Sequence, residues 1–233
     1  EISCSLVGSE MCIRDSYKKI KLIIISKVFN MKKVLLILLS FFSWMSISLA
    51  QEDYTPNAKS AILVDSLSGK VLYEKNADEK LPPASMTKLA SMLLIMESID
   101  NETLKFDDMV TISEEAANMG GSQVFLQAGE TYSVRDLLKS IAIASGNDAV
   151  YAMSEKIGGS HEEFVNMLNK RLKEIGAVNT NFVNAHGLDA EGHYSTARDM
   201  SIIARELLKH EKILEYTSIY AVSYTHLTLP TIR

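Results

Sequence analysis

Cysteine is nearly absent from the sequence, and this limits how the fold can be held together. The chain has 233 residues and two cysteines, Cys4 and Cys12, both near its N-terminus. A disulfide framework is therefore excluded for the remainder of the chain. Stability must come from a buried core, and the 47% content of hydrophobic residues is normal for a globular protein of one large or two small domains.

An excess of positive charge is also missing from most of the chain. Residues 1–50 hold 7 Lys and Arg against 3 Asp and Glu, whereas the remainder holds 17 against 26. Binding to nucleic acid without sequence preference depends on basic side chains that neutralise phosphates. We therefore expect no nucleic-acid partner.

No apolar run reaches the length of about 20 residues that a membrane-spanning helix needs. The run at Val34–Leu39 follows Met31-Lys32-Lys33, is interrupted by serines, and ends in the small residues Ser48-Leu49-Ala50. A basic start, an apolar centre and a small-residue cleavage site are typical of a secretory signal. We predict a signal peptide at 31–50, cleaved after Ala50; the alternative is a membrane anchor.

The two ends of the chain do not fit the rest of it. Residues 1–16 and 222–233 resemble translated adaptor or assembly-junction sequence, and 17–30 read as in-frame upstream sequence. A signal peptide works at an N-terminus, so we expect 1–30 to be non-native or upstream sequence and 222–233 to be a non-native tail. Residues 51–221 then form the domain.

Patterning after residue 51 predicts one β-hairpin followed by several helices. Two β-rich runs, 60–65 and 70–75, are separated by a turn that ends in Gly69. Because two strands alone are marginally stable, we expect them to join a larger sheet or pack on helices. Capping residues and apolar periodicity predict helices at 85–99, 134–144, 148–157, 161–175 and 197–210, and a short strand at 110–112.

Ser85 and Lys88 stand three residues apart at the start of the most apolar predicted helix. This spacing places the hydroxyl and the amine on one helix face, within reach of a hydrogen bond. Such a pair can act as nucleophile and base. The alternative is that Ser85 caps the helix while the Lys88 side chain extends to solvent. Spacing alone favours the alternative.

Further polar groups lie in the predicted connections. Ser145-Gly146-Asn147 separates two helices and presents a hydroxyl and a carboxamide, although it is also an ordinary glycine-containing connection. His186 and His193 lie in a polar loop with no third ligand at metal spacing, so no metal site is expected.

Taken in order, four motifs resemble one family. They are Ser85-Met86-Thr87-Lys88, Ser145-Gly146-Asn147, His186-Gly187-Leu188-Asp189 and the segment from Gly192 to Met200. The chain resembles the serine-type D-alanyl-D-alanine carboxypeptidases of the peptidase S11 family, which are low-molecular-mass penicillin-binding proteins. The resemblance covers about 54–221. It implies an α+β, β-lactamase/transpeptidase-like domain, with an antiparallel sheet and a helical subdomain.

The resemblance also implies an acyl-transfer reaction on peptidoglycan stem peptides, without a cofactor. Ser85 would attack the carbonyl between the terminal D-alanines and Lys88 would take its proton, for which the pKa of Lys88 must fall to about 7 at a cost of roughly 4 to 5 kcal/mol. Ser145 would pass a proton to the leaving amine and Asn147 would bind the substrate amide. His186 would orient groups in the site. β-Lactams would acylate Ser85.

One motif of the family is missing from the sequence. No Lys-Thr-Gly follows Ser145, so the predicted sheet is incomplete, and we expect a truncated catalytic domain. The alternatives are an inactive fragment, an endopeptidase or a β-lactamase of the same fold, although the Glu-x-x-x-Asn motif typical of a β-lactamase is absent. We expect export to the periplasm or the outer face of the bacterial inner membrane, and membrane association only for a full-length protein.

Overall fold

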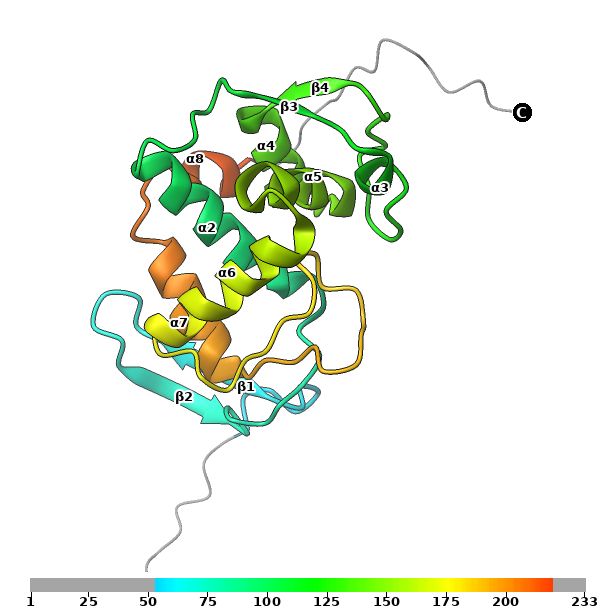
Figure 1. Cartoon of the computed structure of the whole chain (residues 1–233). Helices are drawn as coiled ribbons and strands as arrows, with labels where there is room; N and C mark the ends of the chain where they lie inside the picture. The colour runs from blue at the N-terminus through cyan, green and yellow to red at the C-terminus, as the bar shows by residue number, and fades with distance from the viewer. Residues whose placement is uncertain (1–52, 220–233) are drawn as a thin grey trace, which may run out of the picture. The chain divides into compact units, whose positions relative to one another are not determined.

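A buried helix, α2 (Lys88–Asp100), runs through the centre of the described part of the chain (Figure 1). The computed structural model describes residues 53–219. Nine of the thirteen residues of α2 are buried, as expected for a helix that is apolar around most of its circumference. Helices α4, α5, α6 and α7 all contact it. The predicted helix at 85–99 is therefore confirmed, and its first turn is a separate 3₁₀ helix, η1 (Ala84–Thr87).

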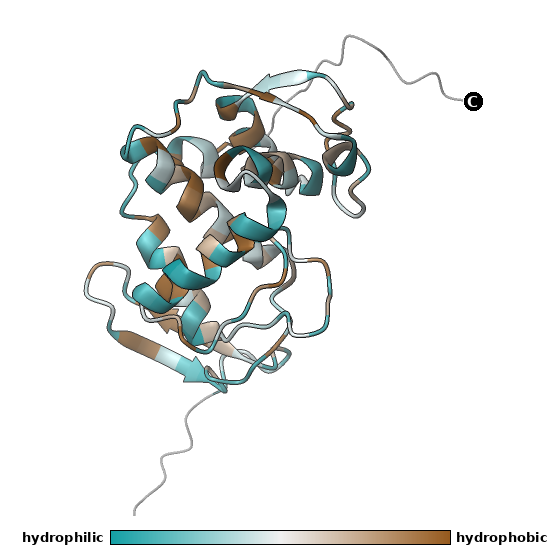
Figure 2. Cartoon of the chain, in the orientation of Figure 1, coloured by the Kyte–Doolittle hydropathy of each residue, from teal (hydrophilic) through white to brown (hydrophobic). Residues whose placement is uncertain are grey.

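The other helices pack on α2 or on its neighbours, with α3 on α5 and α8 on α4, and turn their polar faces outward, which Figure 2 shows most clearly for α6. Their bounds are α3 (Glu114–Ala117), α4 (Val134–Ala144), α5 (Asn147–Gly158), α6 (His161–Glu174), α7 (Ala197–Leu207) and α8 (Ile213–Thr217). The capping residues that predict three of these helices are Ser133, Ser160 and Thr196, and they are confirmed, because each side chain accepts a backbone N–H from three residues ahead. Two expectations were incomplete: α7 ends at Leu207, and the short helices α3 and α8 were not predicted.

Two separate two-stranded antiparallel sheets complete the described structure. The first pairs β1 (Ala61–Val64) with β2 (Val71–Lys75), which confirms the predicted hairpin. The second pairs β3 (Met109–Thr111) with β4 (Thr131–Ser133) and lies beside α4. Only β3 was predicted from the sequence.

Within residues 53–219 the hairpin packs against α7, and no further strand pairs with it. The guanidinium group of Arg205 on α7 donates to the carbonyl oxygens of Ser66 and Leu67 in the hairpin turn, at 3.1 and 3.4 Å. Leu63 and Leu72 remain more than half exposed on the strands. The expectation that a lone hairpin must pack on another element is confirmed by this contact with α7.

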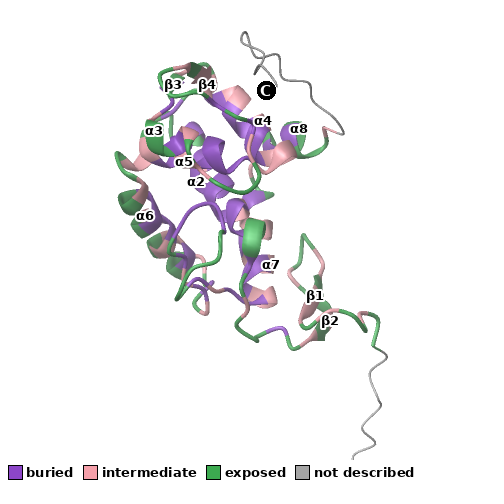
Figure 3. Ribbon diagram, turned by 90° about the vertical axis from the view of Figure 1, so that its right-hand side faces the viewer, coloured by how far each residue is buried: buried purple, intermediate pink, exposed green. Residues whose placement is uncertain are grey.

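Burial is concentrated on α2 and α5, as the purple segments of Figure 3 show. The core also contains buried polar side chains on α2, namely Lys88 and Ser91. Among the helices within residues 53–219, none combines the length and the apolar character needed to cross a bilayer. The predicted signal peptide and both predicted non-native ends lie outside the described residues.

Candidate active site

The turn η1 presents the Ser85 side chain to solvent. Ala84, Ser85 and Met86 are exposed, whereas Thr87 is buried. Neither η1 nor α2 has a side-chain cap, since their N-cap residues are Pro83 and Thr87 and neither makes a capping hydrogen bond. The alternative in which Ser85 serves as a helix cap is therefore wrong.

The Lys88 side chain lies inside the protein and points back to Ser85. Lys88 is 3% exposed. Its Nζ donates to Oγ of Ser85 over 3.2 Å and to the backbone carbonyl oxygen of His186 over 2.7 Å. The alternative in which this lysine extends into solvent is therefore wrong, and the structure brings Ser85, Lys88 and the His186 backbone together.

Burial changes the acid–base chemistry of Lys88. Loss of hydration around the ammonium group lowers its pKa from 10.5 to about 8. A shift of this size corresponds to about 3 kcal/mol of penalty on the charged form. It is smaller than the shift to about 7 expected from the sequence, because burial is its cause and the nearest partners of Nζ are a hydroxyl and a carbonyl, which carry no positive charge. Near neutral pH a fraction of the Lys88 amine is therefore neutral and able to accept a proton.

The loop that supplies the His186 carbonyl is itself fixed to α2. Ser91, three residues after Lys88, donates from Oγ to the carbonyl oxygen of Ala185 over 2.7 Å and is fully buried. Oδ1 of Asn184 accepts the backbone N–H groups of His186 and Gly187. Serine and lysine side chains on one face of α2 thus bind two consecutive carbonyl groups of this loop.

Gly187 allows the loop to approach η1 closely. Its φ is +89°, and a Cβ at this position would lie 2.0 Å from the carbonyl oxygen of Ala84 and 3.0 Å from Oγ1 of Thr87. A residue with a side chain would collide with the backbone of the turn that carries Ser85. Glycine is required here by both the conformation and the contact.

The imidazole of His186 belongs to a different cluster from its carbonyl. The ring stacks on His161 at a centroid distance of 5.7 Å, and His161 stacks on Tyr151 at 4.4 Å. Nδ1 of His186 accepts the N–H of Leu188. Burial, with His161 and Lys88 nearby, lowers the pKa of His186 to about 4, so the ring is neutral at pH 7.

Ser145 ends α4 in the left-handed conformation, with φ +56°. The residue is half-buried. Within residues 53–219, no hydrogen bond joins its hydroxyl to Ser85 or Lys88. The sequence placed Ser145 in a fixed connection between two helices, and this placement is confirmed; its catalytic role stays a prediction.

Asn147 is the first residue of α5 and anchors a glycine-rich segment. Its N–H donates to the carbonyl oxygen of Ser122 over 2.7 Å, and its Nδ2 donates to that of Gly120 over 2.6 Å. Oδ1 of Asn147 is buried without a hydrogen-bond partner among the described residues. A Cβ at Gly121 would lie 2.7 Å from Nδ2 of Asn147 and 3.2 Å from Cδ2 of Leu188. The Ser145-Gly146-Asn147 connection and the loop after His186 therefore border the same short segment.

The sequence profile of one family, described as D-alanyl-D-alanine carboxypeptidase (peptidase S11), matches residues 47–230. The chain belongs to this family. It is 58% identical over 163 residues to the D-alanyl-D-alanine carboxypeptidase DacF of Bacillus subtilis (strain 168). That alignment covers 70% of this chain and 42% of the Bacillus protein. The chain thus spans less than half the length of this curated relative.

Solved structures of penicillin-binding proteins share the fold. The D-alanyl-D-alanine carboxypeptidase DacD from Francisella tularensis aligns with a TM-score of 0.69 and 35% identity, over 72% of this chain and 43% of the other. Penicillin-binding protein D2 from Listeria monocytogenes, in its ampicillin-bound form, aligns with a TM-score of 0.65 and 30% identity, over 74% and 70% of the two chains. The predicted α+β, transpeptidase-like fold is confirmed.

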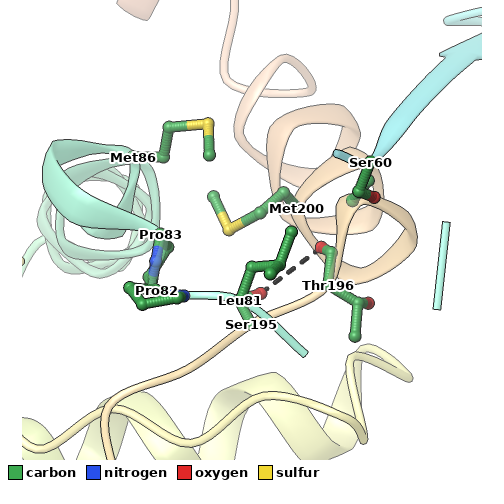
Figure 4. Close-up of a pocket in the computed structure, with 9 residues that line it drawn as sticks. Ser60, Leu81, Pro82, Pro83, Met86, Ser195, Thr196 and Met200 are labelled. Atoms are coloured by element: carbon green, nitrogen blue, oxygen red, sulfur yellow. Dashed lines mark hydrogen bonds between the residues drawn. The ribbon is translucent and has the colours of Figure 1, made fainter. Parts of the chain in front are cut away.

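A small pocket of about 120 Å³ lies between the turn around Pro82–Met86 and the start of α7 in this peptidase S11 chain (Figure 4). Met86 and Met200 face each other across it, and Pro82 and Pro83 form one wall. Neither Ser85 nor Lys88 lines this pocket. It is mostly apolar and is distinct from the Ser85–Lys88 pair.

The sequence did not predict the structural roles of three buried polar residues of the site, Thr87, Ser91 and His193. Ser91 carried a signal, because it continues the three-residue spacing of Ser85 and Lys88 on an otherwise apolar helix. Thr87 and His193 lie in two of the motifs noted above, but no sequence signal links them, since they are 106 residues apart.

Proposed function

We propose that the protein to which this chain belongs is a serine D-alanyl-D-alanine carboxypeptidase that acts on peptidoglycan stem peptides through an acyl-enzyme. The observation that carries the proposal is the 3.2 Å contact between Oγ of an exposed Ser85 and Nζ of a buried Lys88 whose pKa is lowered to about 8. A nucleophile and a base in hydrogen-bond reach are what acyl transfer requires.

In the first half of the reaction, neutral Lys88 takes the hydroxyl proton as Oγ of Ser85 bonds to the carbonyl carbon between the two terminal D-alanines. The oxyanion that forms is stabilised by the N–H of Ser85, which lies in the first turn of η1, where N–H groups have no partner inside the helix. The C–N bond then breaks, the departing D-alanine takes a proton, and an ester to Ser85 remains. Water hydrolyses this ester and restores Ser85.

The roles of Ser145, Asn147 and His186 are part of the same proposal. Ser145 passes the proton to the leaving amine. Oδ1 of Asn147, an acceptor with no partner in residues 53–219, suits an N–H of the substrate. Because Oδ1 is buried, the Gly120–Gly121 segment must shift for the substrate to reach it. His186 orients Lys88 through its backbone carbonyl.

The same chemistry makes β-lactams inhibitors, since their strained amide acylates a serine nucleophile. The similarity to an ampicillin-bound penicillin-binding protein supports this extension. Stem peptides lie outside the cytoplasm, so the proposal includes export, for which the predicted signal peptide at 31–50 is the means.

The proposal concerns a whole protein of this family, because the chain covers 42% of the length of the Bacillus relative and has no Lys-Thr-Gly after Ser145. The test is an assay of D-alanine released from a synthetic stem pentapeptide by the product of the complete reading frame, beside its Ser85→Ala variant. We expect release by the parent protein and none by the variant. Cleavage of cross-linked peptides without D-alanine release would support an endopeptidase instead, and rapid turnover of a β-lactam would support a β-lactamase.

The same assay on the 233-residue chain decides whether this portion is active by itself. No release by the chain, together with release by the complete product, would identify the chain as the acylation half of the site. If neither product acts on any of these substrates, the proposed function is wrong.

A further inference from the structure

The peptide just before Ser85 is held in an unusual conformation. Ala84 has φ +49°, in the left-handed region that residues other than glycine rarely adopt. Such a conformation persists only where surrounding contacts hold it in place. The Ala84 backbone also sets the direction in which both the side chain and the N–H of Ser85 point.

A buried hydroxyl holds this peptide. Oγ1 of Thr87 donates to the carbonyl oxygen of Ala84 over 2.9 Å, and Thr87 is fully buried. A hydroxyl has one proton to donate. Because that proton goes to Ala84, the 2.9 Å contact between Oγ1 of Thr87 and Nε2 of His193 must have the imidazole as donor.

The other ring nitrogen of His193 agrees with this assignment. Nδ1 accepts the backbone N–H of Val183 over 3.1 Å, so it carries no proton, and a neutral ring must then carry its proton on Nε2. The four groups form one directional chain in which Val183 donates to His193, His193 to Thr87 and Thr87 to Ala84. Each donor and each acceptor in this series of hydrogen bonds is used once.

The histidine is fixed in place by its surroundings. His193 is 6% exposed and its ring stacks on Phe182 at a centroid distance of 5.0 Å. Gly187 packs directly against the Ala84 carbonyl and Thr87, since a Cβ there would lie 2.0 Å from that carbonyl oxygen and 3.0 Å from Oγ1 of Thr87. No hydrogen bond joins His193 to Ser85 or Lys88 within residues 53–219.

We propose that His193 is a positioning residue for Ser85: through the hydroxyl of Thr87 it fixes the Ala84–Ser85 peptide, and so aims both the nucleophilic Oγ and the N–H that faces the oxyanion. The inference rests on the proposed acyl-transfer function. It assigns His193 no proton transfer to substrate, since its Nε2 proton is committed to Thr87.

The geometric part of the inference can be tested without measuring enzyme activity. In the 233-residue chain labelled with ¹⁵N-histidine, long-range ¹H–¹⁵N spectra should show His193 neutral with its proton on Nε2. Amide hydrogen exchange at Met86, whose N–H donates to the carbonyl oxygen of Pro83 and closes the η1 turn, should become about tenfold faster or more in Thr87→Val, and should stay near the parent rate in Thr87→Ser. A proton on Nδ1, or equal exchange in the two Thr87 variants, would overturn the inference.

The functional half uses a fluorescent penicillin and the product of the complete reading frame. We expect Thr87→Val and His193→Leu to slow the acylation step about 10- to 100-fold with little change in the binding constant that precedes it. Thr87→Ser and His193→Gln, which keep a hydroxyl and a donor near the Nε2 position, should recover most of the rate. The double variant, Thr87→Val with His193→Leu, should be no slower than the slower single variant, because both substitutions break the same series of hydrogen bonds.

Several results would contradict this expectation. They are a normal acylation step in Thr87→Val, no rescue by Thr87→Ser, or additive losses in the double variant. Circular dichroism and thermal unfolding check that each variant folds; if His193→Leu does not, the Thr87 pair still decides. If the parent protein is not acylated at all, the proposed function fails, while the exchange and ¹⁵N measurements still test the positioning role.

Discussion

The backbone carbonyl oxygen of His186 accepts a hydrogen bond from Nζ of Lys88 over 2.7 Å, between residues 98 positions apart in the sequence. The contact holds the amine beside Ser85 through the dipole of a neutral carbonyl group, and no charged side chain is involved. A carboxylate at the same place would stabilise the ammonium form and raise the pKa of Lys88. The carbonyl orients the amine, while burial lowers its pKa.

The rate of acylation by a β-lactam should therefore rise with pH. Lys88 accepts a proton only when neutral, and with a pKa of about 8 its neutral fraction grows about tenfold per pH unit below that value and levels off above it. Stopped-flow measurements on the complete protein between pH 6 and 9.5 give the profile. A rate that is independent of pH across this range would show that neutral Lys88 is not the base.

Lys88→Met should change how stability depends on pH. In the folded protein the pKa of Lys88 is about 8, against an ordinary value of 10.5. Between these values the unfolded chain binds a proton that the folded chain does not, so the free energy of unfolding rises with pH. Relative to Lys88→Met, the parent chain should gain about 1.4 kcal/mol per pH unit in this window, and about 3 kcal/mol in all.

Denaturant titrations of the 233-residue chain at pH 8, 9 and 10 measure this difference. Lys70→Met is the control, because Lys70 is exposed and its removal should leave the pH dependence of the parent chain unchanged. If the free energy of unfolding changes with pH equally in the parent chain and in Lys88→Met, Lys88 is not buried as described.

Gly187→Ala should destabilise the fold and displace the turn that carries Ser85. Its Cβ would lie 2.0 Å from the carbonyl oxygen of Ala84, on a residue with φ +89°. Gly129 is a matched control, since its φ is +82° but nothing lies within 4 Å of a Cβ there. Thermal or denaturant unfolding should show a loss of about 1 kcal/mol for Gly129→Ala and roughly 3 kcal/mol or more for Gly187→Ala. Equal losses would mean that backbone conformation alone matters at both positions.

Local features of the fold were readable from the sequence because short-range physics decides them. The caps at Ser133, Ser160 and Thr196 each bind an N–H three residues ahead, and the hairpin turn is closed by Asp65, whose Oδ1 accepts from Ser68. The short helices α3 and α8 were missed because four or five residues carry too little periodicity to indicate a helix.

In the site, too, contacts set by local spacing could be predicted, whereas contacts between distant segments could not. Ser85 and Lys88 could be paired from their spacing, since one helical turn brings them together, but spacing alone favoured a capped helix with an exposed lysine. What decides between the two is burial of Lys88 by the loop around His186. That burial depends on contacts between distant segments, as do the links from Thr87 to His193 and from Ser91 to Ala185, and no local pattern records them.

Mass spectrometry of the complete protein after brief exposure to a penicillin tests the central claim most directly. We expect one covalent penicilloyl adduct, located by peptide mapping on Ser85, absent from Ser85→Ala and strongly reduced in Lys88→Met. An adduct on another serine, or an undiminished adduct in Ser85→Ala, would contradict the assignment of Ser85 as the nucleophile activated by Lys88.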